Sequence, residues 1–160
     1  MHFNEFGPFE TVFARGSLSV PGYLPLLNLC GGEVQVVLKR IDGAIDESTN
    51  PGRYIRRLLQ DVNWRMHLVG AVAILLSRDE ESLPVDDLWG AFDAGSWVAP
   101  QLAVTAFFSD KEFVQRARAR VEARVQSGCL KDCCRLNAIL RLAPLENIGV
   151  LARLLPHSWL

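Results

Sequence analysis

Two stretches of the sequence, "NWRMHLVGAVAILLS" at residues 63–77 and "SWVAPQLAVTAFFSD" at residues 96–110, have the same construction. In each of them, a short polar residue and a tryptophan precede a strongly apolar run. Such a run, apolar on nearly every side, is typical of a buried helix. Asn63 and Ser96 are suited to cap these helices, because their side chains can accept hydrogen bonds from amide groups of the first turn.

The likeness extends to the residues before each stretch when the chain is shifted by 33 positions. The aligned residues are two prolines and two pairs of apolar residues: Pro51 on Pro84, Ile55 on Leu88 and Leu59 on Phe92. Each unit therefore predicts an amphipathic helix, a tight turn and a buried helix. The alignment also makes Trp64 and Trp97 equivalent, and we expect both to be anchors of the core rather than ligand contacts.

Helical spacing of apolar residues continues before and after these two units. One set predicts a helix over about residues 32–47: Val34, Val37, Leu38, Ile41 and Ile45. A strand through "EVQVV" leaves most of that set unplaced, so a helix is favoured. Asp110 can cap a long charged helix, "KEFVQRARARVEARVQ", which is followed by the apolar "CLKDCCRLNAILRLA" and a short last helix, "ENIGVLARLL". Residues before Val20 carry no clear pattern.

Successive helix pairs with apolar contact faces predict an all-α protein built from stacked antiparallel helix pairs. The arrangement is that of an α-solenoid or an irregular helical bundle, with about eight or nine helices. A chain of 160 residues can bury one full core, and we expect a single domain over residues 1–160. Its helix-pair units span about residues 51–77, 84–109 and 111–143.

The paired pattern resembles the HEAT and armadillo-like families of α-helical repeat proteins. "NWRMHLVGAVAILL" is similar to the inner helix of such repeats, whose Gly and Ala positions let helices approach closely. The resemblance covers about residues 50–155, although a 33-residue spacing is shorter than these families favour. It implies a scaffold that binds another protein, and small bacterial immunity proteins, which neutralise a cognate toxin, are of this kind.

Composition and cysteine placement favour a cytoplasmic protein without a cofactor. The chain is 49% hydrophobic and 22% charged, contains no apolar run long enough to span a bilayer, and has no signal peptide at its N-terminus. Cys30 stands alone, whereas Cys129, Cys133 and Cys134 are clustered. Because His2, His67 and His157 have no metal-ligand spacing with them, we expect buried thiols and no metal site.

Acidic residues are concentrated between the two apolar helices. The cluster contains six residues: Asp79, Glu80, Glu81, Asp86, Asp87 and Asp93. Asp86 and Asp87 near a helix start would be stabilised by the helix dipole, and this is a sufficient structural explanation. The cluster is larger than capping requires, and the alternative is a docking face for a basic partner protein.

Basic residues form a ridge on the predicted helix after Asp110. Arg116, Arg120 and Arg124 recur at every fourth position and therefore share one helix face. A solvated face is the simplest interpretation, and contact with a partner or with nucleic-acid phosphates is the alternative. A sequence pI of about 6.3 and the absence of interleaved aromatic residues disfavour nucleic acid.

Catalytic motifs are absent from the sequence: it has no phosphate-binding loop, no H-E-x-x-H and no G-x-S-x-G. His67 is better explained as a core histidine bonded to a carbonyl group, although an enzyme with His67 in its site stays an alternative. We therefore predict a protein-binding module without catalytic activity, specifically an immunity protein that binds a basic toxin through the acidic cluster. The apolar end "LLPHSWL" also leaves a homodimer open.

Overall fold

The computed structural model describes residues 5–28, 32–79 and 82–126, and within these residues it is all helical. The elements are a 3₁₀ turn and eight α-helices: η1 (Gly7–Phe9), α1 (Glu10–Phe13), α2 (Leu24–Asn28), α3 (Gly32–Glu47), α4 (Pro51–Gln60), α5 (Trp64–Leu76), α6 (Val85–Asp93), α7 (Ala99–Ser109) and α8 (Phe113–Gln126). The chain divides into two compact units, Met1–Ser109 and Asp110–Leu160, which are treated separately below. The all-α prediction is confirmed for the described part of the chain.

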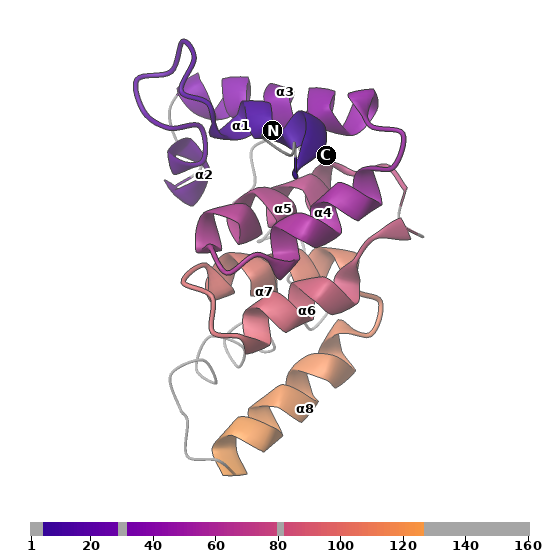
Figure 1. Ribbon diagram of the computed structural model, residues 1–160. Coiled ribbons are helices and arrows are strands. Elements are labelled where there is room, and N and C mark those ends of the chain that lie inside the picture. The colour runs from indigo at the N-terminus through magenta and orange to yellow at the C-terminus, as the bar shows by residue number, and fades with distance from the viewer. Residues whose placement is uncertain (1–4, 29–31, 80–81, 127–160) are drawn as a thin grey trace. The chain divides into compact units, whose positions relative to one another are not determined.

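The first unit is a stack of helix layers (Figure 1). Helix α3, with η1, α1 and α2 against it, forms one layer, the pair α4–α5 forms the next and the pair α6–α7 forms the third. Within the stack α5 packs on α7 and α4 packs on α6, so that equivalent helices of the two pairs contact each other. This arrangement confirms the paired helices expected for residues 51–77 and 84–109.

The two pairs bury the residues that the 33-residue alignment matches. Ile55 and Leu59 of α4 are buried, as are Leu88 and Phe92 of α6. Helix α5 is buried on nearly all sides, with every residue from His67 to Ile74 buried. Burial of this much apolar surface is the main source of the stability of the stack.

Gly70 allows α4 and α5 to approach closely. A Cβ atom at this position would lie 3.1 Å from Cγ and Cδ2 of Leu59 and 3.3 Å from Cβ of Leu58. These separations are shorter than ordinary van der Waals contacts, so a side chain at this position would require Leu58 and Leu59 to shift by a few tenths of an ångström. The small residue in "HLVGAVA" therefore suits the close packing of the pair.

Helix α3 begins and ends where the sequence pattern places it, with one change on its inner face. Val34, Val37 and Ile41 are buried as expected, but Ile45 is only half-buried and Ala44 takes the inward position. Ala44 and Ile45 lie three and four residues after Ile41, so both are near the contact face, and the smaller of the two is the one that is fully buried.

The segment before α3, where the sequence gave no clear pattern, is attached to α3 by polar contacts. The Glu33 carboxylate accepts hydrogen bonds from the Ser19 amide at 2.6 Å and from its hydroxyl group at 2.9 Å. These two bonds favour the charged form and lower the pKa of Glu33. A further bond runs from Nη1 of Arg40 to the carbonyl oxygen of Ala14 at 2.8 Å.

The described part of the second unit is the charged helix α8 and the turn before it. Asp110 lies in the turn before this helix, where its Oδ1 atom accepts a hydrogen bond from the Glu112 amide at 2.8 Å; because the helix begins at Phe113, this bond closes the preceding turn. The apolar helix expected within 129–143, the last helix and all four cysteines lie outside the described residues. No helix of the described residues is long and apolar enough to cross a membrane.

Candidate functional site

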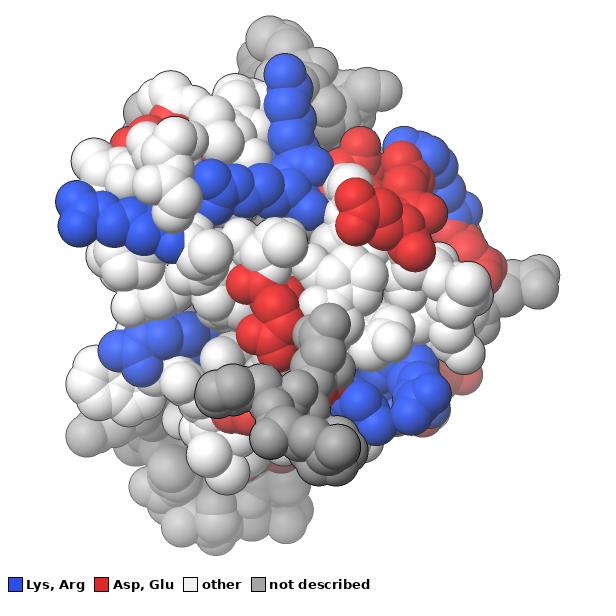
Figure 2. Space-filling model, turned by 45° about the horizontal axis from the view of Figure 1, so that its top comes forward, with Lys and Arg blue, Asp and Glu red and all other residues white. Residues whose placement is uncertain are grey.

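The described residues of the predicted acidic cluster come from α6 and from the segment after α5. Asp86 and Asp87 lie in the first turn of α6, whereas Asp93 is its last residue and Asp79 follows α5. Glu80 and Glu81 lie outside the described residues. On the face seen in Figure 2, acidic side chains gather in a compact group, with basic side chains next to it.

Asp87 links the two helix pairs. Its Oδ2 atom lies 3.0 Å from Nε of Arg56, and its Oδ1 atom accepts a 2.7 Å hydrogen bond from the Gln60 amide group. Both partners belong to α4, so Asp87 ties α4 to α6. Since these bonds occupy both oxygens of the carboxylate, Asp87 acts mainly as part of the scaffold.

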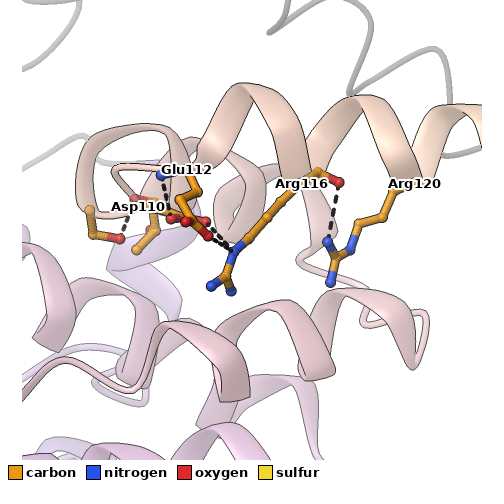
Figure 3. Close-up of polar contacts among 6 residues, drawn as sticks. Asp110, Glu112, Arg116 and Arg120 are labelled. Carbon is orange, nitrogen blue, oxygen red and sulfur yellow. Dashed lines mark hydrogen bonds and ion pairs between the residues drawn. The ribbon is translucent and has the colours of Figure 1, made fainter.

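The predicted basic ridge on α8 is held by groups of its own unit (Figure 3). Nε of Arg116 lies 3.5 Å from Oδ2 of Asp110 and 3.3 Å from Oε2 of Glu112. Arg120 donates a hydrogen bond to the carbonyl oxygen of Arg116 at 3.2 Å. Arg124 belongs to α8, but its side chain lies outside the described residues.

A cleft of about 580 Å³ opens at one end of the two helix pairs. Three parts of the first unit border it: the turn that joins α4 to α5, the turn that joins α6 to α7, and one face of α6. The side chains most relevant to binding are those of Val62, Trp64, Asp86 and Trp97, with Gly90 on the α6 wall and His67 contributed by α5.

His67 connects the two turns at the inner end of the cleft. Its Nε2 atom lies 2.6 Å from the carbonyl oxygen of Asp61, and its Nδ1 atom lies 2.8 Å from Oγ of Ser96. A carbonyl oxygen can only accept, so Nε2 carries a proton and donates it. In the neutral ring Nδ1 then accepts from the Ser96 hydroxyl group, whose oxygen in turn accepts from the Val98 amide at 3.4 Å.

This hydrogen-bond network gives His67 a structural role. The side chain is only 5% exposed, and both ring nitrogens are occupied by protein groups. The expectation of a core histidine bonded to a carbonyl group is confirmed. Its partner Ser96 lies 29 residues away in sequence, and nothing in the residue pattern around His67 indicated that contact.

Trp97 departs from the predicted core position. Its side chain is 85% exposed, whereas Trp64 is half-buried, with its ring 5.8 Å from that of Tyr23 and 4.8 Å from the Arg65 guanidinium group. The expectation that Trp97 is an anchor of the core is therefore wrong. Val98 is buried in its place, at 2% exposure.

Pro100 explains the difference between the two tryptophans. Helix α5 begins at Trp64, but α7 begins at Ala99, two residues later than the alignment predicts. If α7 began at Trp97, Pro100 would be its fourth residue, where a backbone N–H must donate to the Ser96 carbonyl group. Proline has no such donor and its ring would clash there, so the helix starts late and Trp97 stays in the turn.

Comparison with known proteins gives no relative for this chain. No protein-family model matches it, and no curated protein or solved structure matches it at a significant level. Among the described residues, no group of three or more His, Cys, Asp or Glu side chains could hold a metal ion. Function must therefore be inferred from the geometry of the cleft.

Proposed function

We propose that this protein is a protein-binding module and that its partner docks at the cleft between the two inter-helix turns. The observation that carries the proposal is the exposure of Trp97 at the edge of a concave surface. Removal of this large ring from water would be favourable, because a tryptophan buries much apolar area while its N–H can still bond to a partner. Such side chains supply much of the binding energy at protein interfaces.

Val62 strengthens this interpretation. It lies in the other turn that borders the cleft, and its side chain is fully exposed, at 101%. Two exposed apolar side chains therefore flank a hollow whose scaffold is held by buried helices and by His67. A rigid support with exposed aromatic and aliphatic groups is suited to binding, since little ordering is needed when the partner docks.

The specific form of the proposal is an immunity protein that neutralises a toxin. It rests on the resemblance of the helix pairs to HEAT-like repeats, and a basic toxin would complement Asp86 in the cleft. Fold resemblance is weak support for a function by itself. A gene for a toxin next to the gene for this protein, with rescue of growth on co-expression, would test this form.

The two alternative functions, nucleic-acid binding through α8 and catalysis by His67, have less support from the geometry. A nucleic-acid site on α8 would need its arginines for phosphates, but Arg116 and Arg120 already bond to groups of the same unit. An enzyme that used His67 as a base would need a ring nitrogen open to substrate, and both nitrogens are bonded.

The test compares proteins captured from an extract of the source organism by three forms of this chain. These are the wild type, Trp97→Ala and Val36→Ser; Val36 is 40% exposed on α3, does not line the cleft and serves as the control. We expect a protein that the wild type and Val36→Ser capture equally and that Trp97→Ala loses, and titration with that protein after purification should reproduce the loss. Equal capture by all three forms would contradict the proposal.

A further inference from the structure

Arg65, in the first turn of α5, is held against two aromatic rings. Its guanidinium carbon lies 5.2 Å from the centre of the Tyr23 ring and 4.8 Å from that of Trp64, and the two rings are 5.8 Å apart in an edge-on arrangement. Tyr23 directly precedes α2, which packs on α5. Because a cation is attracted to aromatic faces, the packing of these two helices fixes the position of the guanidinium group.

The Arg65 guanidinium group has more hydrogen-bond donors than the surrounding protein uses. Its one hydrogen bond to the described residues runs from Nη1 to Oδ1 of Asn63, at 3.2 Å. The Nε and Nη2 donors have no acceptor among these residues. These two donors form an edge of the group that can bind a carboxylate through two parallel hydrogen bonds. This edge is therefore available to a ligand.

The charge of Arg65 is not balanced in the way that the charges of other arginines are. Arg56 pairs with Asp87, and Arg78 pairs with two aspartates of α3. No Asp or Glu of the described residues forms an ion pair with Arg65, although its side chain is half-buried. A cation that is partly removed from water without a nearby anion is stabilised by binding one. The position of Arg65 therefore favours an anionic ligand.

Trp64 joins this cluster to the cleft. It lines the cleft, and its ring contacts the Arg65 guanidinium group. Arg65 itself does not line the cleft, so a ligand on its free edge would lie beside the cleft rather than among the aspartates that line it. A stable interface covers about 800 Å² of each protein, which is enough to include residues at the rim of a cleft as well as its lining.

We propose that Arg65 binds a carboxylate of the partner protein, from an Asp or Glu side chain, through its Nε and Nη2 donors. This inference rests on the proposed function and specifies one contact of that interface. The rings of Tyr23 and Trp64 hold the guanidinium group in place, so little ordering of its long side chain is needed on binding. A phosphate dianion would use the same donors, but the aspartates of the nearby cleft repel a double charge more strongly than a single one.

The test uses N-acetyl-glutamic acid α-amide as the probe, with the neutral N-acetyl-glutamine α-amide for comparison at the same ionic strength. Each is titrated into the ¹⁵N-labelled full chain while the Arg65 Nε–H and Trp64 indole N–H signals are followed by NMR. We expect saturable shifts at both signals with the glutamate probe, with a dissociation constant of about 10–100 mM, as for one charge-assisted pair. The glutamine probe should cause no saturable shift, and inorganic phosphate should bind more weakly than the glutamate probe.

Arg65→Gln and Arg53→Gln form a matched pair of variants. Arg53 is exposed on α4 and does not line the cleft, so Arg53→Gln removes the same charge away from the rings. Arg65→Gln should abolish the saturable shift of the Trp64 indole signal, and Arg53→Gln should leave it unchanged. Arg65→Lys keeps the charge but lacks the planar pair of donors, and it should weaken the glutamate probe about 2- to 5-fold. This variant still tests the proposal if Arg65→Gln does not fold.

Three results with the wild type would overturn the carboxylate proposal: equal binding of the glutamine probe, no saturable shift with the glutamate probe, or tighter binding of inorganic phosphate. Equal affinity of Arg65→Gln and Arg53→Gln for the glutamate probe would overturn it as well. None of these results affects the wider proposed function, which fails separately if Trp97→Ala captures the same proteins as the wild type.

Discussion

The pairs α4–α5 and α6–α7 share one scaffold but differ at the turn inside each pair. Both bury equivalent apolar residues, and equivalent helices pack on each other. At the turn, the first pair has Trp64 within its second helix and His67 one turn later, whereas the second pair has Trp97 in the turn and Pro100 at the helix start. The second pair therefore differs from the first at the turn that borders the cleft.

The difference indicates that function is to be sought where a repeat is broken rather than where it is regular. The regular positions, such as Ile55 and Leu88, are accounted for by packing. Pro100 delays the start of α7, and the Trp97 ring is therefore left exposed to water. His67 then fixes the two turns to each other through Asp61 and Ser96.

Trp89→Ala should cause the largest loss of stability among these substitutions, and it provides the reference value for removing a buried tryptophan. Its ring is only 2% exposed, within α6 and in edge contact with Phe92 at 5.6 Å. Trp89→Ala should lower the free energy of unfolding by about 3–5 kcal/mol, because it leaves a large cavity in the core. Urea denaturation followed by circular dichroism measures this, and a loss below about 1 kcal/mol would mean that the second pair is loosely packed.

His67→Ala tests the link between the two turns. The substitution leaves the Ser96 hydroxyl group and the Asp61 carbonyl group without their bonds, and we expect a loss of about 2 kcal/mol. His67→Gln, which can still donate one hydrogen bond, should recover part of this loss. If His67→Ala unfolds at the same urea concentration as the wild type, the two turns are not joined through this side chain.

Gly90→Ala in α6 and Gly43→Ala in α3 compare helix propensity in the second pair and in the first layer. Each removes a glycine from a helix interior without a clash, and each should raise the free energy of unfolding by about 0.5–1 kcal/mol. Thermal unfolding of both variants provides the measurement. A destabilised Gly90→Ala would show that the fold needs the open space beside α6.

Acid should affect the attachment of the N-terminal segment before it affects the helix pairs. The pKa of Glu33 is lowered from its ordinary value of about 4.5 by its bonds to Ser19, so its contribution to stability is present above about pH 4.5. That contribution is lost as the pH falls through the lowered pKa. Hydrogen exchange of the Ser19 amide, corrected for the intrinsic exchange rate at each pH, should show less protection at pH 3 than at neutral pH in the wild type. In Glu33→Gln its protection should not change with pH, and amides of α5 should be little affected in either protein. Equal acid sensitivity of both regions would contradict this.

The sequence was sufficient for elements that depend on local rules. The bounds of α3, the Asn63 cap and the buried faces of α4 and α6 all follow from periodicity and capping. Trp97 was misjudged because the alignment treated Pro100 as a neutral difference, although a proline at that position prevents the expected helix start. Pro100 was therefore a signal in the sequence that α7 would begin late.

The cleft could not be predicted, because it arises from two turns that are distant along the chain. Asp86 and Asp87 are neighbours of identical type, yet Asp87 is half-buried and bonds to Arg56 and Gln60 of α4, whereas the Asp86 side chain is exposed. Only the packing of α4 on α6 distinguishes them. The bond between His67 and Ser96 likewise depends on how the pairs stack.

Trp97→Ala tests the central claim most directly, because it removes the side chain that distinguishes the second pair from the first. Thermal unfolding and capture of the partner protein should be measured on the same preparation. We predict a change of less than about 0.5 kcal/mol in the free energy of unfolding, as for other exposed positions, together with loss of the partner. A loss of stability comparable with that of Trp89→Ala, or retention of the partner, would contradict the claim.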